Sequence, residues 1–222
     1  APIFRARRDA EVSASIYNRL PVLIDEAKGG KPGEPGNPWG VSFMAMFHMA
    51  NDSHLFKTKA ELEQAGYTLD GNHFVRGLER YLPLYEAKMI YQYNHRHGDF
   101  HDSPEGERAH VLPSVPVERL CNPNYLTLPF YWVAEAEVRI ALADKEWSAR
   151  WLLGWRDVTD ARASARTLNA TVIPLAAAND GFLLMLPKAG GRRTAALLAN
   201  LCALVCDFVA RQKVGGLHLK YF

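Results

Sequence analysis

The sequence predicts an α+β fold in which mixed or antiparallel β-sheets pack with a few helices. Three observations predict it. Short segments rich in β-branched and aromatic residues, typical of strands, are spread along the chain. A few other segments have apolar residues at helical spacing. The two kinds do not alternate in the regular βαβ order of a parallel sheet. With 222 residues, of which 48% are hydrophobic, the chain suits one folded domain spanning 1–222.

The N-terminal part predicts a helix followed by a loop. Apolar residues recur at helical spacing over 8–20, and Pro21 ends the pattern because proline disfavours a helical residue before it. The next stretch, 27–38, reads AKGGKPGEPGNP and lacks an apolar residue that would anchor it to a core. We therefore expect an exposed, flexible loop there.

The middle of the chain predicts most of the strands and one helix. Residues 57–66 favour a helix ended by Gly66, since glycine readily adopts the left-handed conformation found at helix ends. The polar, histidine-rich stretch 95–116 indicates a loop. Aromatic, β-branched and other apolar residues mark the expected strands, which are 39–49, 81–93, 126–133, 151–158 and 167–175.

The clearest element is a long helix over 193–214. Its apolar residues cover nearly the whole circumference and leave only a narrow polar stripe, so we expect a helix that is buried on most sides. Gly215 and Gly216 would cap its C-terminus, and Arg211 and Lys213 would lie favourably against the negative end of its dipole.

Charge is unevenly distributed along the chain. Residues 151–222 contain nine Lys and Arg against four Asp and Glu, whereas 1–150 contain seventeen against twenty. This asymmetry favours polyanion binding by the C-terminal third.

There is no run of about eighteen apolar residues and no apolar segment typical of a signal peptide. The three cysteines suit buried thiols in a reducing compartment, so we expect a soluble, cytoplasmic protein without a membrane partner.

Two short patterns are compatible with metal chemistry. Asp70, Glu86 and Lys88 resemble a PD-(D/E)xK nuclease centre, in which two carboxylates hold Mg²⁺ and the lysine positions the attacking water. An exposed ion pair or a DNA-facing strand explains the same residues. A strand over HRHGDFHD would point four metal ligands to one side, and a polar surface loop turning at Gly98 is the alternative. These four ligands are His95, His97, Asp99 and His101.

The tetrapeptide Asn122-Pro123-Asn124-Tyr125 invites comparison with the Asn-Pro-Pro-Tyr motif of amino-methyltransferases. Its third residue departs from that motif. No glycine-rich loop follows a strand upstream to bind a methyl donor, because the glycines at 29–36 lie in a Lys- and Pro-rich loop. The tetrapeptide therefore indicates a turn, and we expect no intact methyltransferase site in this chain.

Five blocks of the chain, in this order, resemble the region C-terminal to the catalytic domain in large adenine-specific DNA methyltransferases of Type II and Type IIG-like restriction–modification systems. In that family the methyl-donor loop and the Asn-Pro-Pro-Tyr motif precede this region, so their absence suits a fragment of a longer polypeptide. The resemblance covers nearly the whole chain. The blocks are RARRDAEVSASIYNRLPVLID (5–25), FHMANDSHLF (47–56) after Asn37-Pro38-Trp39-Gly40, YLPLYEAKMIYQYNHR (81–96), GWRDVTDARASARTLNATVIPLAA (154–177) and LLANLCALVCDFVARQKVGGLHLKYF (197–222).

The resemblance implies a target-recognition domain, similar in plan to the specificity domains of Type I systems. Such a domain docks in the major groove of double-stranded DNA, reads a short sequence and helps to present a flipped adenine to the catalytic domain. It implies that this chain alone is no enzyme and holds no cofactor. S-adenosylmethionine would bind the methyltransferase domain of the same polypeptide, which is then a partner, and a fused endonuclease is compatible with the family.

Position within these blocks selects the candidate DNA contacts. Arg and Lys fork onto guanine edges or pair with phosphates, Asn and Gln read bases, and a glycine pair lets backbone approach a phosphate. The family usually has an acidic run before Arg166 and threonine at Leu217, and these departures imply a different target sequence or only different packing. The candidates are Lys88, Gln92, Asn94, His95, Arg96, Arg156, Arg166, Thr167, Lys213, Gly215, Gly216 and His218.

A function without DNA contact is the third hypothesis, beside target recognition and the nuclease. Trp132, Trp147 and Trp151 would form an aromatic surface that docks the catalytic part, and the chain would act as a scaffold or subunit-contact domain. An exposed apolar patch without a basic cleft would favour this hypothesis.

Overall fold

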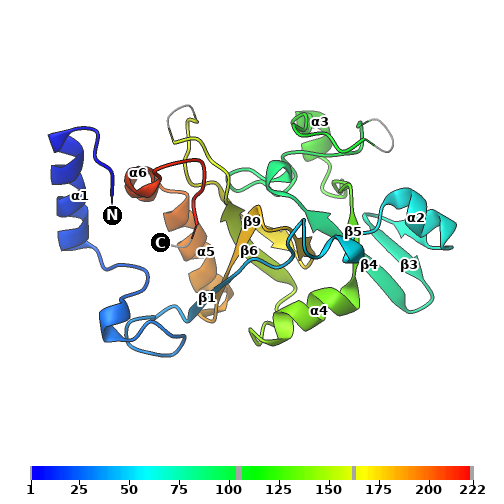
Figure 1. The fold of residues 1–222 in the computed structure, drawn as a ribbon, viewed down its shortest axis with the longest axis horizontal. Coiled ribbons are helices and arrows are strands. Elements are labelled where there is room, and N and C mark those ends of the chain that lie inside the picture. Colours follow the sequence, from blue (N-terminus) through cyan, green and yellow to red (C-terminus); the bar gives the residue numbers. More distant parts are fainter. Residues whose placement is uncertain (1, 104–106, 162–163, 221–222) are drawn as a thin grey trace.

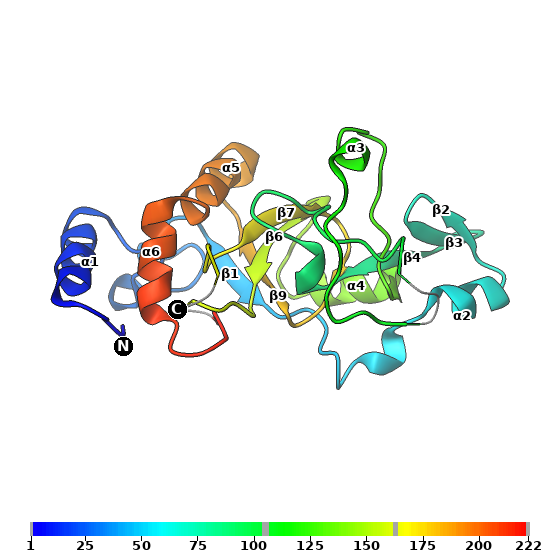
Figure 2. The ribbon, with the colours of Figure 1, turned by 90° about the horizontal axis from the view of Figure 1, so that it is seen from above.

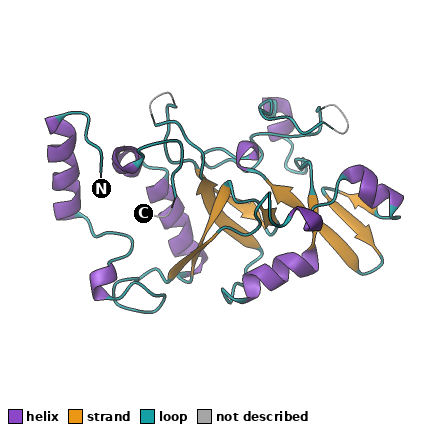
Figure 3. Cartoon of the chain, in the orientation of Figure 1, coloured by secondary structure: helices purple, strands orange, loops and turns teal. Residues whose placement is uncertain are grey.

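The computed structural model describes residues 2–103, 107–161 and 164–220, and it confirms the predicted α+β class. Two largely antiparallel sheets lie side by side, and six α-helices accompany them in the described part of the chain (Figures 1 and 3). The molecule is elongated, with the N-terminal helix at one end and a short β-hairpin at the other (Figure 1).

The first sheet has four strands, and its strand β6 (Trp151–Arg156) ends at Arg156. Its two central strands are almost entirely buried, because one face packs toward the second sheet and the other toward the C-terminal helices. Near-continuous apolar sequence is typical of strands buried on both faces. The strands predicted at 151–158 and 167–175 are confirmed in slightly shorter form. The order is β1 (Val41–Met44), β9 (Phe182–Pro187), β6 (Trp151–Arg156) and β7 (Ala170–Pro174), all antiparallel.

The second sheet shares a hydrophobic core with the first. Leu82 and Leu84 of the second sheet and Leu152 and Leu184 of the first belong to one buried cluster. The strand predicted over 126–133 is wrong for most of its length, because the observed strand begins only at Trp132. The order is β2 (Thr68–Asp70), β3 (His73–Arg76), β4 (Glu79–Tyr85) and β5 (Trp132–Ala134), with β8 (Ala177–Ala178) paired in parallel to β4.

Local capping explains the helix predicted at 57–66. The side chain of Thr58 accepts a hydrogen bond from the amide of Glu61 at 3.3 Å, and Gly66 ends the turn with φ +81°. The helix that follows β5 was not predicted. The remaining short helices and 3₁₀ turns are α2 (Lys59–Gln64), α3 (Val117–Leu120), α4 (Glu135–Ala143), η1 (Glu26–Lys28), η2 (Ser53–Leu55) and η3 (Ala87–Met89).

The single long C-terminal helix predicted over 193–214 is wrong: two helices, α5 (Gly190–Leu201) and α6 (Leu204–Lys213), meet at a 63° bend (Figure 2). The backbone carbonyl of Cys202 accepts a hydrogen bond from Gln92 Nε2 at 2.8 Å, and Ala203 is extended. A tertiary contact thus stabilises the break between α5 and α6. Burial is also less complete than predicted, since Leu204 is 72% exposed.

The described helices include no single one that is long and apolar enough to cross a membrane. The pair α5 and α6 meets the criteria of length and composition only when the two are taken together across their bend.

The N-terminal segment lies along the outer side of α6. Helix α1 (Arg7–Arg19) confirms the helix predicted at 8–20, and the amide of Ile3 donates to the carbonyl of Gln212 at 2.6 Å. The loop 27–38 has a polar anchor that the sequence pattern did not reveal. Asn37 is 1% exposed, and its Nδ2 donates to the carbonyls of Gly30 and Val41 at 3.0 and 2.8 Å.

Candidate nucleic-acid interface

Three segments that are far apart in the sequence meet beside the end of β6. The amide of Tyr93, in the turn after η3, donates to the carbonyl of Ala170 on β7 at 3.0 Å. On the other side, the amide of Thr159 donates to the carbonyl of Leu217 at 2.8 Å. Each of the three groups of predicted DNA contacts therefore contributes to one region.

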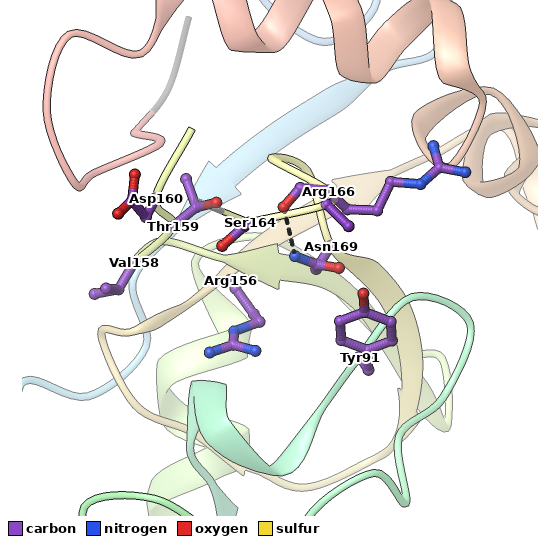
Figure 4. Close-up of a pocket in the computed structure, with 9 residues that line it drawn as sticks. Tyr91, Arg156, Val158, Thr159, Asp160, Ser164, Arg166 and Asn169 are labelled. Atoms are coloured by element: carbon purple, nitrogen blue, oxygen red, sulfur yellow. Dashed lines mark hydrogen bonds between the residues drawn. The ribbon is translucent and has the colours of Figure 1, made fainter. Parts of the chain in front are cut away.

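A recess of about 290 Å³ opens between these segments (Figure 4). The turn after η3 forms one wall, the end of β6 forms the floor, and residues 158–160 and 164–169 form the remaining wall. We call it the Arg156 recess. Its polar lining residues are Tyr91, Arg156, Thr159, Asp160, Ser164, Arg166 and Asn169.

Arg156 is the central cation of this recess. It is the last residue of β6, its backbone amide donates to the carbonyl of Asn169 at 3.0 Å, and its side chain is half-buried. Within the described ranges, its buried Nε has no hydrogen-bond partner, and no carboxylate forms an ion pair with it. Burial lowers the pKa of Arg156 because the charged form loses hydration. A half-buried cation without an acidic partner favours an electron-rich ligand.

Arg166 and Asn169 bring further unpaired polar atoms to the same recess. Nη1 of Arg166 and Oδ1 of Asn169 are buried, and neither has a hydrogen-bond partner among the described residues. Nδ2 of Asn169 faces the carbonyl of Arg166 at 3.5 Å, which orients the amide. The guanidinium of Arg166 extends away from that of Arg156 (Figure 4). The two cations thus cover different parts of the region.

Tyr93 is an exposed aromatic residue in a strained turn next to the recess. Its φ is +60° and its side chain is 58% exposed. A non-glycine residue in the left-handed region is uncommon and is found preferentially at functional sites. The turn is closed by the amides of Tyr91 and Asn94, each of which donates to the carbonyl of the other, at 2.8 and 3.0 Å.

A second recess, of about 230 Å³, lies beyond the 158–166 segment. Its lining includes Arg5, Arg211, Gly215 and Gly216, and we call it the Arg211 recess. Arg211 donates to the carbonyls of three residues in the 158–166 segment at 3.0–3.1 Å, so this arginine also supports the wall of the Arg156 recess. A Cβ built on Gly216 would meet nothing within 4 Å, which leaves that backbone accessible.

His218 and Lys213 of the third predicted group have protein contacts of their own. Nδ1 of His218 lies 2.9 Å from Oδ2 of the buried Asp157, and Lys220 Nζ lies 2.6 Å from the same oxygen. Lys213 Nζ lies 5.7 Å from the centre of the Tyr17 ring. Both predicted residues remain exposed at the surface.

Lys88 and Gln92 lie in the first predicted group but are bound within the fold. Nζ of Lys88 donates to the carbonyl of Ala109 and lies 3.3 Å from Oε2 of Glu86. Gln92 donates to Cys202, as described above. Their polar atoms already have partners, so these residues are weaker candidates for DNA contact than Arg156.

The neighbouring candidates in that group also act within the chain. Arg96 donates to the carbonyls of Leu120, Asn122 and Tyr125 at 2.9–3.1 Å and so holds the end of α3. Oδ1 of Asn94 accepts from the amide of Arg96 at 2.8 Å. Thr167, from the second group, is completely buried. The structure thus brings Arg156 and Arg166 to one recess and gives most of the other candidates internal roles.

The half-buried histidines predict a loss of stability in acid. Burial, aided by neighbouring arginines, lowers the pKa of His73, His95 and His97 below the usual histidine value. Protons therefore bind more readily to the unfolded chain. The stability that these neutral histidines contribute is fully present above their unfolded-state pKa of about 6.5. It is lost as the pH falls from there through their lower folded-state pKa values. Thermal unfolding followed by circular dichroism between about pH 7.5 and 5 should show a falling Tm.

Two histidine variants give the control for this prediction. The double replacement His95→Gln and His97→Gln should flatten the dependence of Tm on pH. Replacement of the exposed His54 by glutamine should leave the slope unchanged. An identical slope in both variants would contradict the assignment.

The nuclease residues are not brought together. Asp70 lies on β2, two strands away from β4, and is level with Leu82, whereas Glu86 follows the far end of β4. With strands about 4.8 Å apart and a rise of about 3.4 Å per residue, the Cα atoms of Asp70 and Glu86 are about 17 Å apart. Oε2 of Glu86 lies 2.5 Å from Arg108 Nη2 and pairs with Lys88. The three residues therefore do not form the predicted Mg²⁺ site.

The histidine-rich stretch does not assemble a metal site either. No group of three or more His, Cys, Asp or Glu lies within reach of one metal ion in the described ranges. Asp99 is buried and accepts from the amides of His101 and Leu128, both at 2.9 Å, and from the hydroxyl of Tyr125. This carboxylate therefore anchors a loop, in agreement with the alternative interpretation.

The tryptophans do not form the aromatic docking surface. Trp132 is 2% exposed in a small core with Phe74. Trp147 and Trp151 are half-buried and pack against each other edge to face with centroids 4.9 Å apart. The apolar patch that would favour the scaffold hypothesis is not built by these residues.

Sequence reasoning missed Tyr91, Tyr93 and Asn169 as site residues. All three lie within the blocks that carry the family resemblance, two of them beside Gln92. Tyrosine and asparagine are as common in cores and turns as in binding sites, so their type alone does not single them out. Only the position of Tyr91 and Asn169 in the lining of the Arg156 recess, and of Tyr93 in the adjoining turn, distinguishes them.

Comparison with known proteins adds no relative to this geometry. No protein-family model, no curated protein and no solved structure matches the chain.

Proposed function

We propose that this chain recognises double-stranded DNA as the target-recognition domain of an adenine-specific restriction–modification methyltransferase. The observation that supports it is the pair Arg156 and Arg166: Arg156 lines the recess, the guanidinium of Arg166 extends to a different part of the same region (Figure 4), and each carries a buried N–H group that lacks a partner among the described residues. The surrounding surface adds Arg5 and Lys213, which are exposed. A polyanion with hydrogen-bond acceptors suits such a surface better than a neutral ligand does.

The proposal assigns positioning and readout to this chain and leaves methyl transfer to a catalytic domain of the same polypeptide. S-adenosylmethionine would bind that domain, and both would act on DNA in the bacterial cytoplasm. The similarity in plan to Type I specificity domains is part of the proposal. The rim residues Arg5, Lys213 and Arg166 would neutralise phosphates, and Arg156 would read a base, because a planar forked donor matches a pair of acceptors on one base edge.

The test is binding of this chain to fluorescein-labelled duplex DNA of random sequence, measured by fluorescence anisotropy over a series of salt concentrations with Mg²⁺ present. The logarithm of the binding constant should fall linearly with the logarithm of salt concentration, with a slope of about −0.9 per phosphate contacted. The DNA should remain intact on a gel. Replacement of Arg166 by glutamine should weaken binding and reduce the slope by about one contact.

A matched control is Arg139→Gln. Arg139 lies on α4, on the opposite side of the sheets from the 158–166 segment (Figure 1), with a 63% exposed side chain paired to Glu135. This variant should bind like the unaltered chain. Absence of duplex binding at the lowest salt would contradict the proposal, as would equal losses in the two variants. Mg²⁺-dependent cutting would contradict the expectation that this chain has no catalytic activity.

A further inference from the structure

We propose that the Arg156 recess receives one guanine base that has left the base stack of the bound DNA. This inference rests on the proposed function, because the DNA must first dock on the basic surface. It adds a base-specific pocket on this chain, separate from the site where a catalytic domain would hold its target adenine.

The first step is the mixed character of the unpaired polar groups. Two residues that line the recess, Arg156 and Asn169, each point a buried side-chain atom without a hydrogen-bond partner among the described residues toward this region. Nε of Arg156 is a donor, whereas Oδ1 of Asn169 is an acceptor. Buried polar groups in folded proteins normally have partners, so a cluster of both kinds at one recess marks a ligand that both accepts and donates. A phosphodiester only accepts and would face the lone pairs of Asn169.

The second step is the geometry of the donors. An arginine fork matches two acceptors on one edge of a planar group, and among DNA bases only guanine offers that pair, O6 and N7. Guanine also carries N1–H and the N2 amino group on its other polar edge, and these donors suit Oδ1 of Asn169. Adenine presents a donor beside N7 and would set its amino group against the guanidinium of Arg156.

The third step is the shape of the recess. Its volume of about 290 Å³ is close to the lower end of small-molecule sites, which suits a base better than a larger ligand. The ring of Tyr91 forms one wall and is itself supported by His97, with ring centroids 5.0 Å apart and an interplanar angle of 33°. An aromatic wall on which a base can pack, facing a cation across a narrow space, is how proteins hold unstacked bases. Figure 4 shows Arg156, Asn169 and Tyr91 around this space.

The experiment compares four labelled duplexes of the same flanking sequence by anisotropy: fully paired, or with one unpaired guanine, adenine or 7-deazaguanine. The guanine bulge should bind about tenfold more tightly than the paired duplex and the adenine bulge. 7-Deazaguanine lacks the N7 acceptor and should lose most of that preference. Arg156→Lys keeps the charge without the fork, so the ratio of its affinities for the guanine bulge and the paired duplex should fall from about ten toward one, with the same salt dependence for both.

The outcomes separate the two proposals. Equal binding of all four duplexes by the unaltered chain would overturn the guanine pocket and leave DNA recognition standing, whereas no binding of the paired duplex would overturn DNA recognition itself. A guanine preference that survives both 7-deazaguanine and Arg156→Lys would place base readout elsewhere and overturn the inference. If Arg156→Lys does not fold, as judged by its thermal melt, the 7-deazaguanine comparison on the unaltered chain decides the question.

Discussion

Replacement of Asp207 by alanine is expected to lower the free energy of unfolding by about 4 kcal/mol. The carboxylate is buried on α6, and its Oδ1 accepts from the backbone amides of Thr167 and Leu168 at 2.8 and 2.9 Å. Its Oδ2 lies 3.6 Å from the guanidinium of Arg211. Alanine would leave two buried amides and one half-buried cation without this acceptor. Urea unfolding followed by tryptophan fluorescence measures the loss.

Asp207→Asn is the matched control for this prediction. Asparagine keeps one oxygen that can accept from both amides and removes only the charge, so less than half of the loss should remain. Because Asp207 holds the backbone next to Arg166, the alanine variant should also lose DNA affinity at temperatures where it is still folded. An alanine variant as stable as the unaltered chain would show that these hydrogen bonds contribute little.

The second large effect is expected from Gly154→Ala. Gly154 lies in the middle of β6 between β7 and β9, and a Cβ at this position would meet the carbonyl oxygen of Leu183 at 2.4 Å and the ring of Phe182 at 2.8 Å. Both neighbours are fully packed in the core, so they have no room to retreat. We expect a loss of about 3 kcal/mol, or a fall in Tm of roughly 6–12 °C, measured by differential scanning calorimetry.

Gly191→Ala provides the contrast. Gly191 lies in the first turn of α5, it is exposed, and a Cβ built on it meets nothing within 4 Å. Alanine has the higher helix propensity, so this variant should be unchanged or more stable by up to about 1 kcal/mol. If both glycine variants unfold at the same temperature as the unaltered chain, the close approach of β6 and β9 is looser than the structure indicates.

The site was only partly predictable from the sequence. Arg156 and Arg166, two of the predicted DNA contacts, lie in one region, since a strand end and the following loop bring nearby residues together by local geometry. Lys88 and Arg96 were selected on the same reasoning, yet both are held by carbonyl groups from segments distant in the sequence. Which lysine or arginine is left without a partner depends on the whole packed chain. DNA recognition itself stays a prediction until binding is measured.

By itself, the sequence determined the fold class, the helix at α1, the strands β6 and β7, and the concentration of positive charge in the last third. These features depend on residue type and short-range periodicity, which are properties of neighbouring residues. The tertiary structure decided the break between α5 and α6, the burial of Asn37 and Asp207, and the meeting of Tyr91, Arg156 and Asn169. Each of these depends on hydrogen bonds or contacts between residues far apart along the chain, for which a single sequence carries no local signal.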